Sequence, residues 1–345
     1  MWKVLLPVIL LVLFSFFNLL GIKNYLVINQ LFFIAAGLVA YVLIRKIGFH
    51  YLKQNIPILY WFFILVLVAT YIIGVEVKGS KRWIDFYYFN IQPSEIFKVF
   101  YVLFLADFFS KKKEYELGVK TYVTGLFSMM LPAVIILKQP DLGNAMVYAG
   151  SFFMIALFSR TPKKYIFWTL ILFFLLTPLL WNVLGEFQKQ RITTFINPTL
   201  DQRGAGYNML QAVITTGSGK FAGKGLGYGT QSKLFYLPEN HTDFAFSSLV
   251  EQFGFFGGFF IISFYIFLFI SLLKKIVQYA KPTWDKENEC YFLFLIGFFA
   301  ILFTQTVINI GMNMGLFPIT GITLPFISYG GSSLVSLLIG FALLR

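Results

Sequence analysis

The sequence has few charged residues and almost no cysteine or histidine. Only 12% of its 345 residues are Asp, Glu, Lys or Arg, whereas soluble domains carry about 25%. The single cysteine, Cys290, excludes an internal disulfide and a metal site made of cysteines alone. The low charge excludes an ordinary soluble domain, and the 58% of hydrophobic residues predicts a membrane protein.

Long apolar runs fill most of the chain. Each is about 17–25 residues long, enough at 1.5 Å per residue to cross a hydrocarbon core of about 30 Å as a helix. A β-barrel would instead show alternating segments of about ten residues. We therefore expect an all-α polytopic membrane protein, one transmembrane domain over residues 1–345. About ten helices are predicted, at residues 4–20, 26–44, 56–75, 93–109, 121–137, 142–158, 165–184, 244–273, 290–311 and 322–344.

The distribution of basic residues predicts the orientation. With the N-terminus in the cytoplasm, sixteen basic residues lie on the inner side, and the short outer connections hold only Lys23, Lys78, Lys81, Arg82 and Lys138. Because cytoplasmic loops are enriched in Lys and Arg, both termini are expected inside. The long segment of about residues 185–242, between the seventh and eighth predicted helices, is then extracytoplasmic. The net charge of +13 is explained by topology, and no soluble basic domain is present to bind nucleic acid.

Asp243 is the strongest candidate for a catalytic residue. It follows Glu239 and His241 in a polar, turn-rich stretch and precedes a long apolar run that contains Glu251. A helix N-terminus favours an ionised carboxylate, and such a group at a membrane surface can deprotonate a hydroxyl. The alternative is that Thr242 or Asp243 only caps the helix. For His241 the alternatives are a metal ligand and an ordinary loop side chain.

Three further polar groups lie at the predicted outer ends of helices or in the outer loop. Glu95 and Lys98 are three residues apart on one helix face, where they either neutralise each other or line a cavity. Asp141 either caps the next helix or joins a buried network with Lys98. The glycine-rich tract 216–229 is not a P-loop, because Ser218 and Gly225 break that pattern. Its amides and lysines either hold a pyrophosphate or form a flexible loop.

Together these stretches resemble the SEDS family of membrane glycosyltransferases, the shape, elongation, division and sporulation proteins. The resemblance covers nearly the whole chain and rests on residues 79–84, 92–98, 139–143, 190–198, 206–211, 223–227, 237–258 and 309–333. It implies the same ten-helix fold and long outer loop. Gly229-Thr230-Gln231-Ser232 is most similar to the elongation member, and the division member is the near alternative. The chain departs from the family pattern at Asn144, Ala245 and Gln252.

The resemblance implies a reaction and roles for individual residues. The family polymerises lipid II into β-1,4-linked glycan strands at the bacterial cytoplasmic membrane, with inversion at the transferred sugar. The position of Asp243 is its essential acid, which we interpret as the general base, with Glu239 and His241 beside it as substrate-binding residues. Glu95, Lys98 and Asp141 correspond to residues that line its central cavity.

The departing polyprenyl pyrophosphate needs positive charge. The candidates are a divalent cation, Mg²⁺ or Mn²⁺, for which no ligands are assigned, or basic residues. Among the basic residues Arg191 and Lys224 rank first because they lie in family motifs, followed by Arg82, Arg203, Lys220 and Lys233.

The resemblance also implies a partner, a class B penicillin-binding protein that supplies the transpeptidase. Two other functions compete with the enzyme. A lipid-precursor flippase would place ionisable residues near the bilayer midplane, whereas the acids here lie near predicted helix ends. A scaffold for the transpeptidase would tolerate the loss of Asp243.

Overall fold

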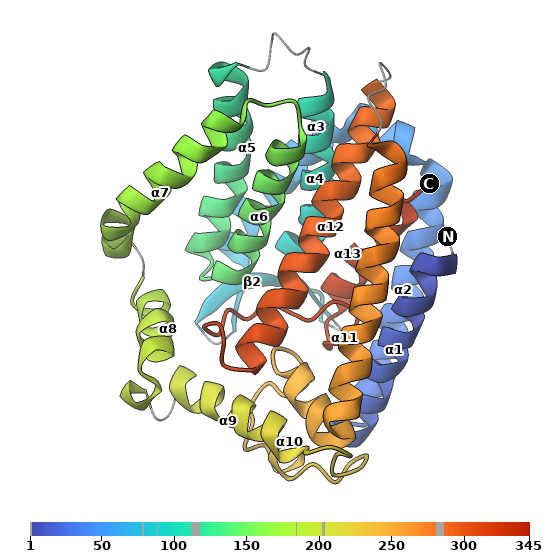
Figure 1. Cartoon of the computed structure of the whole chain (residues 1–345), viewed down its shortest axis with the longest axis vertical. Coiled ribbons are helices and arrows are strands. Elements are labelled where there is room, and N and C mark those ends of the chain that lie inside the picture. The colour runs from blue at the N-terminus through green and yellow to red at the C-terminus, as the bar shows by residue number, and fades with distance from the viewer. Residues whose placement is uncertain are drawn as a thin grey trace. The chain divides into compact units, whose positions relative to one another are not determined.

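A computed structural model describes residues 2–77, 79–87, 89–111, 118–183, 185–201, 204–280 and 286–345. Every predicted span contains a helix (Figure 1). Six of the described helices are long and apolar enough to cross a membrane: α1 (Trp2–Ile22), α2 (Leu26–Ile47), α3 (Phe49–Ile73), α5 (Val119–Lys138), α11 (Ala245–Tyr279) and α12 (Lys286–Asn313). The chain is thus a polytopic helical membrane protein. The basic residues Lys78, Lys112, Lys113, Arg203 and Lys281 lie outside the described residues.

The chain begins with three long apolar helices, α1 (Trp2–Ile22), α2 (Leu26–Ile47) and α3 (Phe49–Ile73). The link from α2 to α3 is the single residue Gly48, whose φ of 81° lies in the region that glycine adopts without strain. Large apolar side chains such as Ile28, Phe32 and Ile58 are exposed on these helices. Exposed apolar surface of this extent is what lipid-facing helices present.

A small antiparallel sheet, which was not predicted from the sequence, connects α3 to the next helix. It consists of β1 (Val75–Val77), β2 (Ser80–Asp85) and β3 (Asn90–Ile91), in the order β1-β2-β3. Gly79, with a φ of 78°, forms part of the tight turn between β1 and β2. The sheet matters for the site because β2 carries Arg82.

Four helices follow: α4 (Pro93–Lys111), α5 (Val119–Lys138), α6 (Leu142–Phe158) and α7 (Lys163–Val183). Most side chains of α4 are buried, and aromatic rings pack along it. Phe104 stacks on Tyr60 of α3 with 4.1 Å between ring centroids, and Phe97 stacks on Phe63 at 5.3 Å. Since α4 is enclosed by apolar groups, its polar side chains must find partners within the protein.

The long segment after α7 contains more regular structure than its glycines suggested. It forms α8 (Glu186–Ile196), a 3₁₀ turn (Pro198–Leu200), α9 (Ala205–Ser218) and the short α10 (Thr230–Lys233). None of these described helices has the length and hydropathy of a membrane span. This agrees with the prediction that the segment adds no further crossing.

The 35-residue helix α11 (Ala245–Tyr279) is interrupted at Gly254, whose φ is 69°. Hydrogen bonds from the glycine-rich tract compensate for this break. The amides of Lys224 and Gly225 donate to the carbonyls of residues 251 and 252, at 2.9 and 3.0 Å. In return, the amide of Phe255 donates to the carbonyl of Lys220 at 2.8 Å. These bonds replace those that the helix loses, which an apolar surrounding requires.

The last two helices are α12 (Lys286–Asn313) and α13 (Gly331–Ala342). The predicted span 322–344 is a helix only from Gly331, because the preceding residues turn. Phe326 has a φ of 66° and follows Pro325, neither of which fits a helix interior. This irregular stretch, residues 314–330, lies close to Asp243 through contacts described below.

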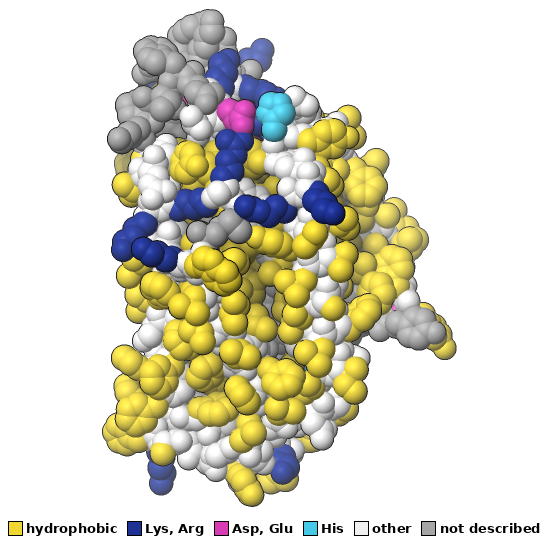
Figure 2. Space-filling view, turned by 90° about the vertical axis from the view of Figure 1, so that its right-hand side faces the viewer, with side chains coloured by type: hydrophobic (Ala, Val, Ile, Leu, Met, Phe, Trp, Pro, Cys, Tyr) yellow, Lys and Arg dark blue, Asp and Glu magenta, His cyan; other side chains and the backbone are white. Residues whose placement is uncertain are grey.

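The chain divides into two compact units. Unit 1 consists of Met1–Leu38, Lys189–Leu272 and Phe303–Val335, and unit 2 of Val39–Gln188, Leu273–Leu302 and Ser336–Arg345. Figure 2 shows one face, where hydrophobic side chains cover most of the surface and the visible basic side chains lie mainly in the upper part of the view. An apolar surface of this extent is typical of a protein surrounded by lipid.

Candidate active site

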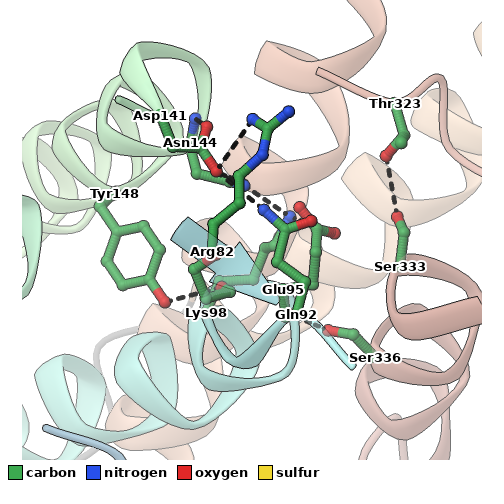
Figure 3. A network of polar contacts seen from close by, with 11 residues as sticks. Arg82, Gln92, Glu95, Lys98, Asp141, Asn144, Tyr148, Thr323, Ser333 and Ser336 are labelled. Carbon is green, nitrogen blue, oxygen red and sulfur yellow. Dashed lines mark hydrogen bonds and ion pairs between the residues drawn. The ribbon is translucent and has the colours of Figure 1, made fainter. Parts of the chain in front are cut away.

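Unit 2 contains a buried network of charged and amide side chains (Figure 3). Lys98 Nζ lies 2.8 Å from Glu95 Oε2 and donates to Asn144 Oδ1 at 3.3 Å. Lys98 is 1% exposed and Glu95 4% exposed. The predicted pairing on one face of α4 is therefore present. The ion pair is bound by Asn144, which in the sequence stood out only as a departure from the family pattern.

Asp141 both caps α6 and joins the buried network, the two alternatives that the sequence left open. Its Oδ1 accepts the backbone amide of Asn144, which caps α6, and its Oδ2 accepts the Asn144 side-chain amide at 2.9 Å. Gln92 donates to the same Oδ2 at 2.8 Å. Because Asn144 also accepts from Lys98, one amide side chain connects the helix cap to the ion pair of α4.

Arg82 joins this network from the sheet. Its Nη1 lies 3.6 Å from Asp141 Oδ2, and its guanidinium lies over the Trp83 ring, 4.4 Å from the centroid. The side chain is 15% exposed, and Nε has no hydrogen-bond partner in the described part of the chain. The four ionisable groups balance two negative against two positive charges, and Arg82 has the most exposed side chain of the four.

The turn that carries Asp243 belongs to unit 1 and is fixed by its main chain. The carbonyl of Asp243 accepts from Asn309 Nδ2 and Asn313 Nδ2, both at 3.0 Å. The carbonyl of Thr242 accepts from Ser328 Oγ at 2.5 Å, and that of His241 from the amide of Tyr329 at 2.8 Å. Three successive carbonyls are thus bound by α12 and the irregular stretch after it.

The side chains of this turn are half-buried. Thr242 Oγ1 donates to Glu239 Oε2 at 2.7 Å, and His241 Nδ1 lies 3.4 Å from Lys23 Nζ. Asn313 Oδ1 accepts the amide of Ser247 at 3.0 Å, which supplies a cap for the first turn of α11. This capping bond at the start of α11 therefore comes from Asn313 on α12 and not from Thr242 or Asp243.

Glu251 is the other acid of this region, and its carboxylate is fully enclosed. Oε1 lies 2.8 Å from Lys224 Nζ and accepts the amide of Gln231, and Oε2 accepts the amide and hydroxyl of Ser232. Lys224 Nζ also donates to Thr230 Oγ1 at 2.7 Å. The ammonium group that ranked high for pyrophosphate binding is thus engaged in holding the glycine-rich tract to α11.

Gln252, one of the departures from the family pattern, is also structural. Its Nε2 donates to Asn18 Oδ1 at 2.7 Å and to the Asn18 carbonyl at 3.3 Å. Its Oε1 accepts the amide of Gly227 at 3.1 Å. The side-chain amide of Gln252 thus donates to α1 and accepts from the glycine-rich tract, whereas an ionised carboxylate only accepts hydrogen bonds.

The remaining candidates are dispersed. Arg191 lies on α8 and is half-buried, Lys220 and Lys233 are exposed, and Arg203 lies outside the described residues. In the described ranges no group of three or more His, Cys, Asp or Glu side chains could hold a metal ion. We therefore assign no residues to a divalent cation.

Comparison with known proteins identifies the family. The model of the cell cycle protein family that includes FtsW, RodA and SpoVE matches residues 2–345. The chain belongs to this family. The SEDS resemblance found in the sequence is thereby confirmed.

Two curated relatives illustrate its two branches. The peptidoglycan glycosyltransferase MrdB of Escherichia coli K12 is 35% identical over 311 residues, which cover 90% of this chain and 82% of that protein. The probable peptidoglycan glycosyltransferase FtsW of Hydrogenovibrio crunogenus is 31% identical over 327 residues, covering 94% and 82%. Both similarities extend over most of each protein.

Solved structures share the fold along the whole chain. A chain in a structure on the coordination of polymerization and crosslinking by a peptidoglycan synthase complex superposes with a TM-score of 0.83 at 26% identity, covering 99% of this chain and 96% of that one. The rod shape determining protein RodA of Thermus thermophilus superposes with a TM-score of 0.73 at 26% identity, covering 99% and 94%. The polytopic fold predicted from the sequence is confirmed.

Proposed function

We infer that this chain is a peptidoglycan glycosyltransferase that polymerises lipid II into β-1,4-linked glycan strands during cell-wall elongation. The observation that supports this most is the family match along residues 2–345, with the acid that the family resemblance marks as essential at Asp243. The names of the relatives support the reaction. The rod-shape name of a structural neighbour favours elongation over division.

In this mechanism Asp243 is the general base. Its carboxylate takes the proton from the sugar 4-hydroxyl of an incoming lipid II. That oxygen attacks the anomeric carbon of the growing strand with inversion, and the polyprenyl pyrophosphate leaves. A base that is correctly placed contributes about 10²–10⁴-fold to the rate. The bound carbonyls of residues 241–243 favour this role because they fix the main chain from which the carboxylate extends.

The charge network of unit 2 is proposed to bind the polar part of the substrate. Its own charges balance, so it provides a buried polar surface rather than a strong anion site. Arg82 is the member best placed for a phosphate oxygen, because its side chain is partly exposed and those of the other three ionisable members are buried. Lys98 and Asp141 keep this surface in shape through Asn144. Glu239 and His241 are proposed to contact the sugar beside Asp243.

The proposed location is the bacterial cytoplasmic membrane, with both termini in the cytoplasm and the active site outside. The unequal distribution of basic residues supports this orientation. The proposed partner is a class B penicillin-binding protein. The support is the similarity to a chain from a structure concerned with coupled polymerization and crosslinking.

Reconstitution tests the function against its two alternatives. Purified protein in lipid vesicles receives lipid II, with and without the partner, and polymer is measured on gels. We expect polymer from the wild type and none from Asp243→Ala. Glu76→Ala, an exposed acid on β1, is the matched control and keeps full activity.

Each alternative has its own result. Lipid II that crosses the vesicle membrane without forming polymer would identify a flippase. Polymer that appears only with the partner, and equally with Asp243→Ala, would identify a scaffold. Either result rejects the proposed function.

A further inference from the structure

Two buried asparagines of α12 bind the backbone of the residue that we propose as the base. Asn309 and Asn313 are one helical turn apart and 0% exposed. Both side-chain amides point their N–H groups at one acceptor, the Asp243 carbonyl, at 3.0 Å each. A buried asparagine is costly unless its donors and acceptors are satisfied. Two such residues converging on one carbonyl indicate that the position of this carbonyl matters.

The Asn313 side chain uses its two ends for different tasks. Its Oδ1 accepts the amide of Ser247 at 3.0 Å and the Ser247 hydroxyl at 2.7 Å, which anchors the first turn of α11. Its Nδ2 donates to Asp243 and to the carbonyl of Asn309. Asn309 in turn donates to the carbonyl of Ile322 at 2.7 Å. The pair therefore connects the Asp243 turn, the start of α11 and the stretch after α12.

Fixing the Asp243 carbonyl restricts the positions that its carboxylate can take. An aspartate side chain has only two rotatable bonds, so within one rotamer the position of its carboxylate follows from the position of its main chain. A displacement of about 1 Å in a reacting group lowers a rate by about a hundredfold. Neighbouring carbonyls at residues 241 and 242 are held as well, by Tyr329 and Ser328. The whole turn is thus bound by α12 and the stretch that follows it.

We propose that Asn309 and Asn313 are positioning residues that hold Asp243 in place for proton abstraction. The inference rests on the proposed function, since it gives the asparagines a role only if Asp243 is the base. The two residues act on the chemical step and not on the affinity for lipid II. Their loss therefore lowers kcat and leaves KM nearly unchanged.

The decisive variant is Asn313→Asp. It is isosteric and keeps an oxygen for the Ser247 amide, but it loses the donor to the Asp243 carbonyl. We expect kcat for lipid II polymerisation to fall about ten- to a hundredfold, with KM within about threefold of wild type. Ser247→Ala is the matched control. It removes the hydroxyl bond to Asn313 and leaves the donors to Asp243 intact, so kcat stays within about threefold.

A neutral variant separates the lost donor from the added charge. Asn309→Ala removes one of the two donors without introducing a carboxylate, and kcat falls about three- to tenfold with KM unchanged. Hydrogen exchange at the amides of residues 242–244 increases in both asparagine variants and not in Ser247→Ala. A kcat loss in Asn313→Asp with full activity in Asn309→Ala would mean that charge alone is responsible, which overturns the proposal.

Asp243→Asn shows which hypothesis has failed. If this variant keeps polymerising, Asp243 is not the base and the proposed mechanism falls. If it is inactive while both asparagine variants keep wild-type kcat, only the positioning role is rejected. Equal losses in Asn313→Asp and Ser247→Ala likewise reject it in favour of general packing. Should Asn313→Asp not fold, Asn309→Ala decides in its place: a lowered kcat with unchanged KM supports the positioning role, and an unchanged kcat rejects it.

Discussion

Glu251 and Asp243 lie eight residues apart in unit 1, yet the fold holds them by different atoms. At Glu251 the hydrogen bonds go to the carboxylate oxygens, which Lys224, Ser232 and the amide of Gln231 surround. At Asp243 the two asparagines bind the main-chain carbonyl, and the side chain is half-buried. An acid held by its carboxylate has a structural role. The bonds from Asn309 and Asn313 position the main chain of Asp243 instead.

The largest expected effect is on the rate of Asp243→Asn. The amide cannot accept the proton, so polymerisation falls by about 10²–10⁴-fold. Thermal unfolding in detergent remains within about 1 kcal/mol of wild type, because a half-buried side chain is changed without altering its size. A large loss of stability with a modest loss of rate would place Asp243 in the same class as Glu251 and end the comparison.

Glu251→Ala is expected to show the reverse pattern. The change leaves the Lys224 ammonium and the amides of Gln231 and Ser232 without their acceptor, which costs about 3–5 kcal/mol of unfolding free energy. Glu251→Gln keeps the volume and one acceptor, so its cost is smaller. Thermal unfolding of both variants checks this order. Equal stability of Glu251→Ala and wild type would contradict a structural role for the carboxylate.

Gly254→Ala tests whether the glycine-rich tract needs the break in α11. A Cβ at this position would lie 2.3 Å from the Gly223 amide nitrogen, and the φ of 69° strains any other residue. We expect a loss of about 1–3 kcal/mol. Gly217→Ala in α9 is the control, because its Cβ meets nothing within 4 Å. If both variants unfold at the same temperature, the close approach at Gly254 is not required.

Gln252→Glu is expected to have the smallest effect on polymerisation. It removes the amide donor to Asn18, whose own Nδ2 already donates to the Ala245 carbonyl and the Ser248 hydroxyl. The unfolding free energy therefore falls by about 1–3 kcal/mol, the cost of an unsatisfied buried polar group, and kcat is unchanged. Measured stability and kcat together check this. A rate change would give Gln252 a part in the reaction that its contacts do not suggest.

The sequence was a good guide to the helices and a partial guide to the site. Each apolar run predicted as a span contains a helix, because lipid imposes an apolar requirement on every segment that crosses it. Spacing along one helix predicted the pairing of Glu95 with Lys98, which are neighbours on any α-helix. The start of α13 was misplaced because Pro325 and Phe326 bend an apolar stretch that hydropathy alone counts as span.

Composition and local order along the chain thus determined the class of protein and its family, and they made Asp243 the first candidate for a catalytic residue. Only the tertiary structure decided which polar groups serve which purpose. Asn144 connects Lys98 to Asp141, Lys224 is bound by Glu251, and two asparagines some seventy residues beyond Asp243 hold its carbonyl. The reason is physical. The period of a helix determines which of its own residues are neighbours, so the sequence alone predicts those pairs. A hydrogen bond between distant segments depends on how the folded chain brings them together.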